Sequence, residues 1–354
     1  MNDDLLNKQK NTSFVSQKNF HKISELFHSF HFVEKVILVE EINSKSKLKP
    51  IISNHFSFEE TNTQNFKIEL INKKKYLAKR ISKSIDILEL ENQSKIMEWC
   101  KSQGALVPTP YKHKNNTFIF EEENYFWMIM DFIDGRYFYG SDNQISETSK
   151  SISILLSCLK NMSEKIHPFA YKKPYFTKDE HLIFNDLVSS KNEWDKVFPA
   201  LLSKKLLKNY DYITSQWNEL KNYKNFDDPK INIIHNDLHP QNIIFDKNKI
   251  YIIDFESIMF GPIESCLGFS IIKLGKKIFD FDANSLHQNF KKLFMESINI
   301  DVKTKDLEMF GKAEVFRKFL SMMNKEIKKI PYSSNGPEVH IDSLRVADII
   351  FSQV

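Results

Sequence analysis

Alternation of apolar and polar positions marks the first third of the chain as rich in strands. Residues 64–71 read QNFKIELI, with an apolar side chain at every second position from Phe66, which is typical of a strand with one buried face. Residues 75–81 and 56–61 predict two further strands, within a strand-like pattern that runs from 33 to 81. Short polar connections such as Asn72-Lys73 separate these segments.

Helical spacing of apolar residues precedes this sheet and dominates the rest of the chain. One helix is expected at 20–31 and another at 84–102, with Gly104 just past its end, where a C-cap glycine belongs. Two more strands are expected at 117–120 and in the apolar part of 125–136. Later helices are predicted over 146–165, 178–195, 200–222 and from about 262 to the end, apart from a loop around Pro331–Pro337. Strands first and helices afterwards, without βαβ alternation, predict an α+β fold.

One short hairpin interrupts the helical part, in the stretch IIHNDLHPQNIIFDKNKIYIIDFE from Ile233 to Glu256. Its strands are expected at 243–245 and 250–255, with a polar turn between them. If the turn centres near residues 247 and 248, paired positions have numbers that sum to about 495, and Asn242 lies across from Ile253. Asn242 and Asp254 can then present two oxygens to one point. Hard oxygen ligands with room left for water and phosphate are what Mg²⁺ takes in nucleotide sites.

A second acidic residue, Asp237, lies five positions before Asn242, in a loop that Pro240 stiffens. A carboxylate fixed beside a metal-bound phosphate can orient a substrate hydroxyl and accept its proton. The sequence therefore gathers a candidate base and two candidate metal ligands within eighteen residues, Asp237 to Asp254.

These residues carry a resemblance to a known family. His235-x-Asp237-x-x-x-x-Asn242, with Ile-Asp-Phe around Asp254 twelve residues later, resembles the aminoglycoside phosphotransferase/choline kinase family of small-molecule kinases. The resemblance implies a bilobal protein-kinase-like fold, with a small antiparallel-sheet N-lobe at 1–130 that binds nucleotide. A larger, mainly helical C-lobe at 131–354 would carry catalysis and the substrate. It also implies Asp237 as catalytic base, Asn242 and Asp254 as Mg²⁺ ligands, and ATP as cofactor.

The first third of the chain then supplies the nucleotide contacts by the same resemblance. YLAKRI at 76–81 is similar to the third strand of kinase-like lobes, which assigns the α- and β-phosphates to Lys79 and leaves Arg80, on the opposite face of the strand, as the alternative. The next helix offers Glu91 as the partner of that lysine, with Glu89 as second choice. DFIDGR is similar to the hinge between lobes, where backbone groups at Asp131 and Ile133 would contact adenine. Tyr125, Phe126 and Trp127 nearby could line an adenine or cation pocket.

Two features depart from the family pattern. FEETNTQN at 58–65 has no glycine where protein kinases carry a glycine-rich phosphate loop, which argues more against a protein kinase than against an enzyme. Cys266 stands where the family commonly has an aspartate that supports the catalytic loop, so we expect an effect on local stability.

Composition narrows the class of protein. The 354 residues are 41% apolar, and 50 basic against 46 acidic side chains leave a net charge of only +4, with no concentrated basic face for nucleic acid. Three scattered cysteines form neither a metal spacing nor a disulfide framework, as expected in a reducing compartment. No stretch of eighteen apolar residues and no signal-peptide pattern occurs, so we expect a cytoplasmic protein that does not span a membrane.

The expected function is an ATP- and Mg²⁺-dependent phosphotransferase whose partners are a nucleotide and a small molecule with a hydroxyl group, such as an amino alcohol, sugar or aminoglycoside. Alternatives are a kinase-like enzyme acting on a protein, a non-catalytic nucleotide-binding module, and, from His235-x-Asp237-x-His239, a metal hydrolase that would need further ligands. Aminoglycosides favour clustered carboxylates, and quaternary ammonium groups favour aromatic cages. The C-terminal helices hold both kinds of residue: Glu308, Glu314, Phe310, Phe316 and Phe319.

Overall fold

The computed structural model describes residues 12–14, 17–30, 32, 36–42, 63–162, 175–227, 229–281, 286–298, 300–330 and 336–352. The chain divides into two compact units, Met1–Gly135 and Arg136–Val354. The strand expected at 56–61 lies outside the described residues, and the lobe boundary expected at 130 stays a prediction. No helix in the described ranges has the length and apolar character needed to cross a bilayer.

An antiparallel sheet forms the centre of the first unit. Among the described residues it has six strands in the order β1-β2-β3-β4-β6-β5. The strands are β1 (Thr12–Phe14), β2 (Val36–Ile42), β3 (Thr63–Leu70), β4 (Lys75–Ser82), β5 (Ile119–Glu121) and β6 (Tyr125–Asp131). The predicted strands at 64–71, 75–81, 117–120 and 125–136 are confirmed to within a few residues at most ends.

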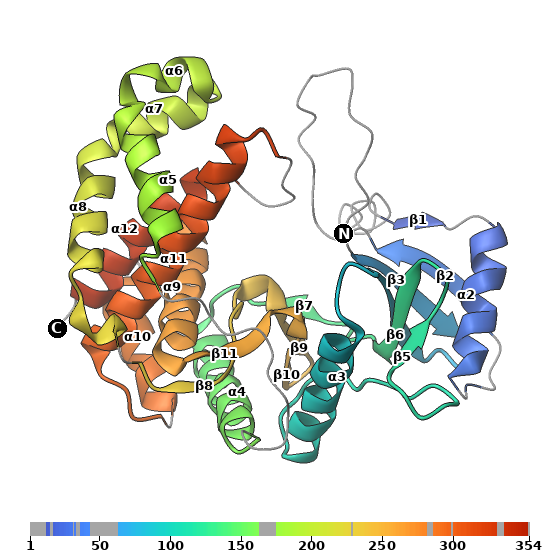
Figure 1. Cartoon of the computed structure of the whole chain (residues 1–354). Coiled ribbons are helices and arrows are strands. Elements are labelled where there is room, and N and C mark those ends of the chain that lie inside the picture. The colour runs from blue at the N-terminus through green and yellow to red at the C-terminus, as the bar shows by residue number, and fades with distance from the viewer. Residues whose placement is uncertain are drawn as a thin grey trace, which may run out of the picture. The chain divides into compact units, whose positions relative to one another are not determined.

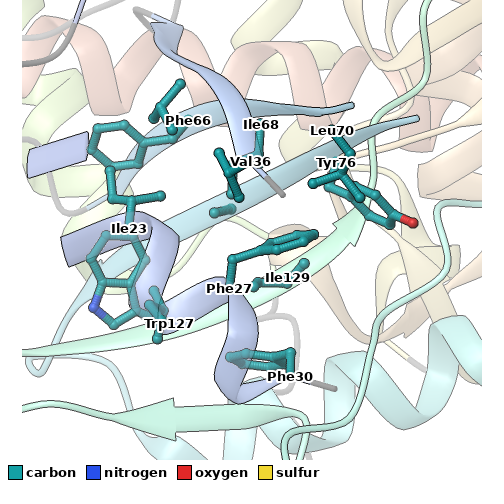
Figure 2. Close-up of a cluster of buried hydrophobic side chains, with 13 residues drawn as sticks. Ile23, Phe27, Phe30, Val36, Phe66, Ile68, Leu70, Tyr76, Trp127 and Ile129 are labelled. Carbon is teal, nitrogen blue, oxygen red and sulfur yellow. The ribbon is translucent and has the colours of Figure 1, made fainter. Parts of the chain in front are cut away.

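Helix α2 (Gln17–Ser29) covers one face of this sheet (Figure 1). Its apolar side chains, Phe27 among them, pack against alternate residues of the strands, including Ile68, Ala78 and Ile129, all of which are fully buried (Figure 2). Period-two alternation places exactly these strand positions on one face. The cluster is apolar because each strand contributes the apolar side chains of its alternate positions to the face covered by α2.

Helix α3 (Ile87–Ser102) lies against the opposite face of the sheet. Asp86 caps its N-terminus by accepting the Leu88 N–H at 2.9 Å, and Gly104 follows its end with a φ of +90°, as the sequence predicts. The Ser94 hydroxyl contacts the sulfur of Met128 in β6 at 3.8 Å. Since neighbouring strand residues point to opposite faces, the α3 side of β4 is the side of Lys79, which pairs with Met128.

The second unit begins with short strands that frame the predicted hairpin. β8 (Ile231–His235) pairs with β11 (Ile258–Pro262), and β9 (Ile243–Asp246) pairs with both β10 (Lys249–Ile252) and β7 (Arg136–Tyr137). In the hairpin Asp246 faces Lys249 and Ile243 faces Ile252, so the predicted register is confirmed. The pairing of β8 with β11 and the strand β7 were not predicted.

Helices make up the rest of the described second unit. They are α4 (Asp142–Lys160), α5 (Lys178–Ser189), α6 (Trp194–Val197), α7 (Ala200–Lys208), α8 (Tyr210–Lys221), α9 (Ile263–Phe281), α10 (Leu286–Ser297), α11 (Thr304–Ile327) and α12 (Glu338–Ser352). The single helix expected over 200–222 is wrong. It breaks at Asn209, whose side-chain amide donates to the Lys205 carbonyl at 2.7 Å while its oxygen accepts from Arg345. A tertiary contact therefore sets a break that apolar spacing does not reveal.

Helices α9 and α11 cross at two glycines. A Cβ placed on Gly268 would come within 2.8 Å of the Gly311 Cα, and one placed on Gly311 would come within 2.5 Å of the Gly268 carbonyl carbon. Backbone atoms cannot yield as a flexible side chain can, so only glycine permits this approach. Figure 1 shows the two helices side by side. The crossing fixes where the side chains further along both helices lie.

Candidate active site

The loop after β8 is held by the buried imidazole of His235. Its Nε2 donates to the Ile253 carbonyl at 3.1 Å, its Nδ1 accepts the Asp237 N–H at 3.4 Å, and its ring meets Phe255 edge to face. Burial lowers the pKa of His235, which favours the neutral form that these two bonds require. His235 therefore fastens the loop to the hairpin, and both of its nitrogens are engaged by the protein.

Asn242 joins the loop to the end of the hairpin. Its Nδ2 donates to the Asp237 carbonyl at 2.9 Å, and its own carbonyl accepts the Ile253 N–H at 3.0 Å. A carbonyl oxygen can only accept, so the amide nitrogen must face Asp237 and the orientation of the carboxamide is fixed. The backbone bond to Ile253 places Asn242 beside the residue that precedes Asp254, as the register predicts.

Asp254 ends the second strand earlier than expected. The predicted strand over 250–255 stops at Ile252, because Asp254 takes the left-handed conformation, with φ 68° and ψ 67°. Aspartate tolerates this region better than most residues but still at a cost of about 1 kcal/mol. Its side chain lies exposed at the turn into the short 3₁₀ segment 255–257. Strained, non-glycine backbone of this kind is often retained for a function.

Asp237 has two polar contacts through its carboxylate. Oδ1 lies 2.6 Å from the ammonium of Lys318, and Oδ2 accepts from His239 Nε2 at 3.3 Å. Burial opposes ionisation, but the His239 hydrogen bond and the Lys318 charge outweigh it and hold the pKa of Asp237 well below its usual range. About a quarter of each side chain of the Asp237–Lys318 pair stays exposed, so the ionised carboxylate is within reach of a ligand.

Lys318 is the residue of this site that the sequence did not reveal. It lies on α11, eighty-one positions after Asp237, and nothing around it matches a motif. His239 enters the sequence prediction only as a candidate metal ligand of the hydrolase alternative. Its Nδ1 accepts the Gln241 N–H at 3.1 Å while Nε2 faces Asp237, so the protein uses both nitrogens, as it does in His235.

Cys266 supports the same loop from α9. Its thiol lies buried and donates to the His235 carbonyl at 3.0 Å. A thiol is a weak donor, so the position that commonly carries an aspartate in the family still bonds the loop here, by a softer group.

The first unit holds the residues assigned to the nucleotide. Lys79 is buried on the α3 face of β4, whereas Arg80 lies on the other face, with its guanidinium 4.4 Å from the Tyr125 ring and bonded to Gln64. Trp127 is buried in the α2 cluster and donates to Glu122 at 3.0 Å. The aromatic side chains of 125–127 are thus part of the packing of this unit.

Glu91 and Glu89 occupy different sides of α3. Glu91 Oε1 accepts the backbone N–H of Ile119, at 2.9 Å, in edge strand β5. Since β6 separates β5 from β4, that contact lies two strands, or about 10 Å, from the strand of Lys79. Glu89 instead accepts from the buried Gln93 one turn later, at 3.4 Å. These contacts favour Glu89 over the first-choice Glu91 as the partner of Lys79, and the assignment stays a proposal.

The expected hinge begins at the end of β6. The Asp131 carboxylate accepts the Tyr111 hydroxyl at 2.6 Å and the Thr109 N–H at 3.1 Å, and its own N–H donates to the Thr109 carbonyl. Ile133 lies two residues on, half-buried in irregular backbone. The Asp131 side chain therefore anchors the segment before the strand, and contact with adenine through the backbone stays a prediction. Residues 58–62 of the expected phosphate loop lie outside the described residues.

Comparisons with known proteins place this geometry in context. The family model APH, described as "Phosphotransferase enzyme family", matches residues 59–265. No curated protein sequence matches the chain.

Solved structures share the fold at low sequence identity. The chain is similar to a spectinomycin phosphotransferase in complex with ADP and spectinomycin, with a TM-score of 0.61 and 14% identity over 94% of this chain and 97% of that one. It is similar to a choline kinase from Streptococcus pneumoniae, with a TM-score of 0.54 and 14% identity over 95% and 100% of the two chains. A Plasmodium vivax ethanolamine kinase gives 0.52 and 16% over 83% and 82%. The predicted kinase-like α+β fold is confirmed.

Proposed function

Because the chain belongs to the APH phosphotransferase enzyme family, we propose that it is an ATP- and Mg²⁺-dependent kinase acting on a hydroxyl group of a small molecule. The observation that carries this proposal is the position of Asn242. Its side chain bonds to the Asp237 backbone, and its carbonyl bonds to the residue before Asp254. Asp237, Asn242 and Asp254 thus belong to one loop and hairpin that hydrogen bonds through Asn242 hold together.

The donor set suits magnesium. Asn242 and Asp254 would hold the ion, through one amide oxygen and one exposed carboxylate, and Mg²⁺ characteristically combines few protein ligands with waters and phosphate oxygens. Bound there, the ion would neutralise charge on the phosphates. His235 and His239 have both ring nitrogens engaged by protein groups, which disfavours the hydrolase alternative in which they would bind a transition metal.

Asp237 would act on the acceptor hydroxyl. The oxygen of that hydroxyl forms the new bond to the γ-phosphorus, the bond from phosphorus to the bridging oxygen breaks, and ADP leaves with the electron pair. The hydroxyl proton passes to the Asp237 carboxylate. A carboxylate with a depressed pKa is a weak base, so its larger contribution is to orient the hydroxyl, while the proton moves as the phosphoryl group transfers.

Lys79 would hold the α- and β-phosphates, supported by Glu89 or Glu91. Its burial suits this role, since a lysine on a buried strand face needs a nearby counter-charge. ATP rather than another nucleotide is the proposal that the family resemblance supports.

The test is ATP turnover by the full chain against a panel of amino alcohols, sugars, hydroxy acids and aminoglycosides, with protein in a lysate as a separate arm. Asp237→Asn should reduce kcat for the best acceptor by about 10²–10⁴-fold, because positioned acid–base groups contribute on that scale. Asp246→Asn, in the turn of the same hairpin, is the matched control and should keep its activity. Equal turnover by the wild type and Asp237→Asn would refute the role of Asp237. Phosphate transfer to protein alone would favour the protein kinase alternative.

A further inference from the structure

Two lysine side chains, from helices α9 and α11, lie near the candidate base Asp237. Lys318 on α11 lies 2.6 Å from Asp237 Oδ1, and its ammonium also lies 4.3 Å from the centre of the Phe269 ring. Lys273, one turn after Phe269 on α9, has its ammonium 5.5 Å from the same ring centre. Two lysine ammonium groups therefore meet at one aromatic ring beside the candidate base.

Two acidic residues of α11, Glu314 and Glu308, are already paired with cations. Glu314 is fully buried and binds Arg317 through both oxygens, at 2.6 and 3.1 Å, with Asn236 adding a bond at 3.4 Å. Glu308 lies 2.7 Å from Lys312. A substrate with ammonium groups would have to displace a bonded protein cation to reach either carboxylate.

The aromatic residues of α11 are committed to packing. Phe310, Phe316 and Phe319 are all almost fully buried, and their rings pack on other rings of the second unit. The Phe269 ring already has the Lys318 ammonium where an aromatic cage would receive a quaternary ammonium group. The carboxylates and aromatic rings of α11 that the sequence offers for a cationic acceptor are thus already in contact with other side chains of the protein.

We propose that the acceptor is a small alcohol that also carries a carboxylate or phosphate group, which Lys318 and Lys273 bind while the hydroxyl faces Asp237. This inference rests on the proposed function and names the substrate class of the same site. An ammonium group has three N–H donors. Within the described part of the chain Lys318 makes one hydrogen bond, to Asp237, and can donate to a ligand as well.

The surroundings of Lys273 hold its ammonium in place. It donates to the Ser343 hydroxyl at 3.1 Å and contacts His340 Nδ1 at 3.5 Å, both on α12. His340 in turn donates from Nε2 to the Met322 sulfur, which fixes Nδ1 as the acceptor. Burial, with the charge of Lys318 next, lowers the pKa of Lys273 to about 7. The charge of Asp237 acts against this shift, and a bound anion would add a further counter-charge for the ammonium.

The glycine crossing sets the spacing of the two lysines. Gly268 immediately precedes Phe269, and Gly311 lies two helical turns before Lys318. Because the backbones touch there, α9 and α11 come close enough for both lysines to share the Phe269 ring. The site is therefore built from helix packing that leaves no room for side chains at the crossing.

The experiment measures thermal stabilisation of the full chain by hydroxy acids such as glycerate and gluconate, and by a sugar phosphate. Ethanolamine, choline and kanamycin form the cationic arm, and glucose the neutral arm. We expect the anionic alcohols alone to raise Tm. Lys318→Met and Lys273→Met should each weaken that binding by about 10- to 100-fold, and Lys318→Arg should restore part of it. Lys325→Met, further along α11, is the control and should leave binding unchanged.

Comparing the hydroxy acids with the sugar phosphate shows whether the site binds a carboxylate or a phosphate group. Stabilisation by cationic or neutral alcohols alone, no shift with any anionic alcohol, or full anion binding by both methionine variants would overturn the proposal. The stabilisation by Mg²⁺ with a non-hydrolysable ATP analogue is measured separately. If the anionic alcohols stabilise the chain but Mg²⁺ with the ATP analogue does not, the proposed function is contradicted. If Mg²⁺ with the analogue stabilises the chain but the anionic alcohols do not, this inference is contradicted.

Discussion

The hairpin at 243–252 and the crossing of α9 with α11 build two sides of one candidate site in different ways. In the hairpin, a two-residue turn and the register that follows from it place Asn242 across from Ile253, the residue before Asp254. At the crossing, Lys318 reaches Asp237 from eighty-one positions away, through a contact between two glycines. Local pairing therefore positions the groups proposed for the metal, while tertiary packing positions the groups proposed for the acceptor.

The largest effect should come from the hairpin. Asp254→Asn keeps the size of the side chain but removes the negative charge proposed to bind Mg²⁺, so kcat should fall by about 10²–10³-fold at saturating ATP. Asparagine also tolerates the left-handed backbone, so the free energy of unfolding should change little. Steady-state kinetics at several Mg²⁺ concentrations, with circular dichroism of both proteins, test this. Unchanged kcat in a folded variant would remove Asp254 from the site.

At the crossing of α9 and α11, a substitution should mainly change the free energy of unfolding. In an open helix Gly→Ala stabilises by about 1 kcal/mol, but at Gly268 the new Cβ would strike the backbone of α11, so we expect Gly268→Ala to lower the free energy of unfolding by about 2–4 kcal/mol. Urea unfolding measures this loss, with Lys325→Ala at a half-buried position near the end of α11 as a reference near zero. Gain of stability in Gly268→Ala would mean that the helices are not in backbone contact.

These two regions also show what sequence can predict. The hairpin register followed from a turn signal and two apolar runs, because strand pairing is fixed once the turn is. The end of the second strand did not, since only the fold shows that Asp254 adopts a positive φ. Lys318 carried no signal, because helix periodicity says which face is buried but not which distant loop that face meets. The break at Asn209 depends on Arg345 and was equally invisible.

The sequence only partly predicts which glutamate, Glu89 or Glu91, pairs with Lys79. Both are on the predicted helix, and only the contact from Glu91 to the Ile119 N–H separates them. We expect Glu89→Gln to raise KM for ATP by about tenfold, since it would weaken the ion pair proposed to hold Lys79. Glu91→Gln should instead cost about 1 kcal/mol of stability with KM little changed. Kinetics and urea unfolding of both variants decide, and the opposite pattern would restore Glu91 as the partner.

The stability of the protein should also depend on pH, through Lys273 on α9. Burial holds the pKa of Lys273 at about 7 in the folded protein, whereas a lysine ordinarily has a pKa of 10.5, so between pH 7 and 10.5 the unfolded chain holds a proton that the folded chain lacks. The free energy of unfolding should therefore rise with pH from about 7 towards 10 through this group. Allowing for its partial exposure, Lys273→Met should be more stable than wild type by about 2 kcal/mol at pH 6. Urea unfolding should show that difference shrinking by pH 9, whereas a difference independent of pH would contradict the shift.

The account depends most on Asn242 and Asp254 sharing one magnesium ion. A double-mutant cycle tests this directly, with the affinity of the intact chain for Mg²⁺ and a non-hydrolysable ATP analogue measured by calorimetry for wild type, Asn242→Ala, Asp254→Asn and the double variant. If both groups bind the same ion, the losses will not add, and the coupling energy should exceed about 1 kcal/mol. Losses that add to within about 0.5 kcal/mol, or nucleotide affinity that is unchanged when Mg²⁺ is removed, would contradict it.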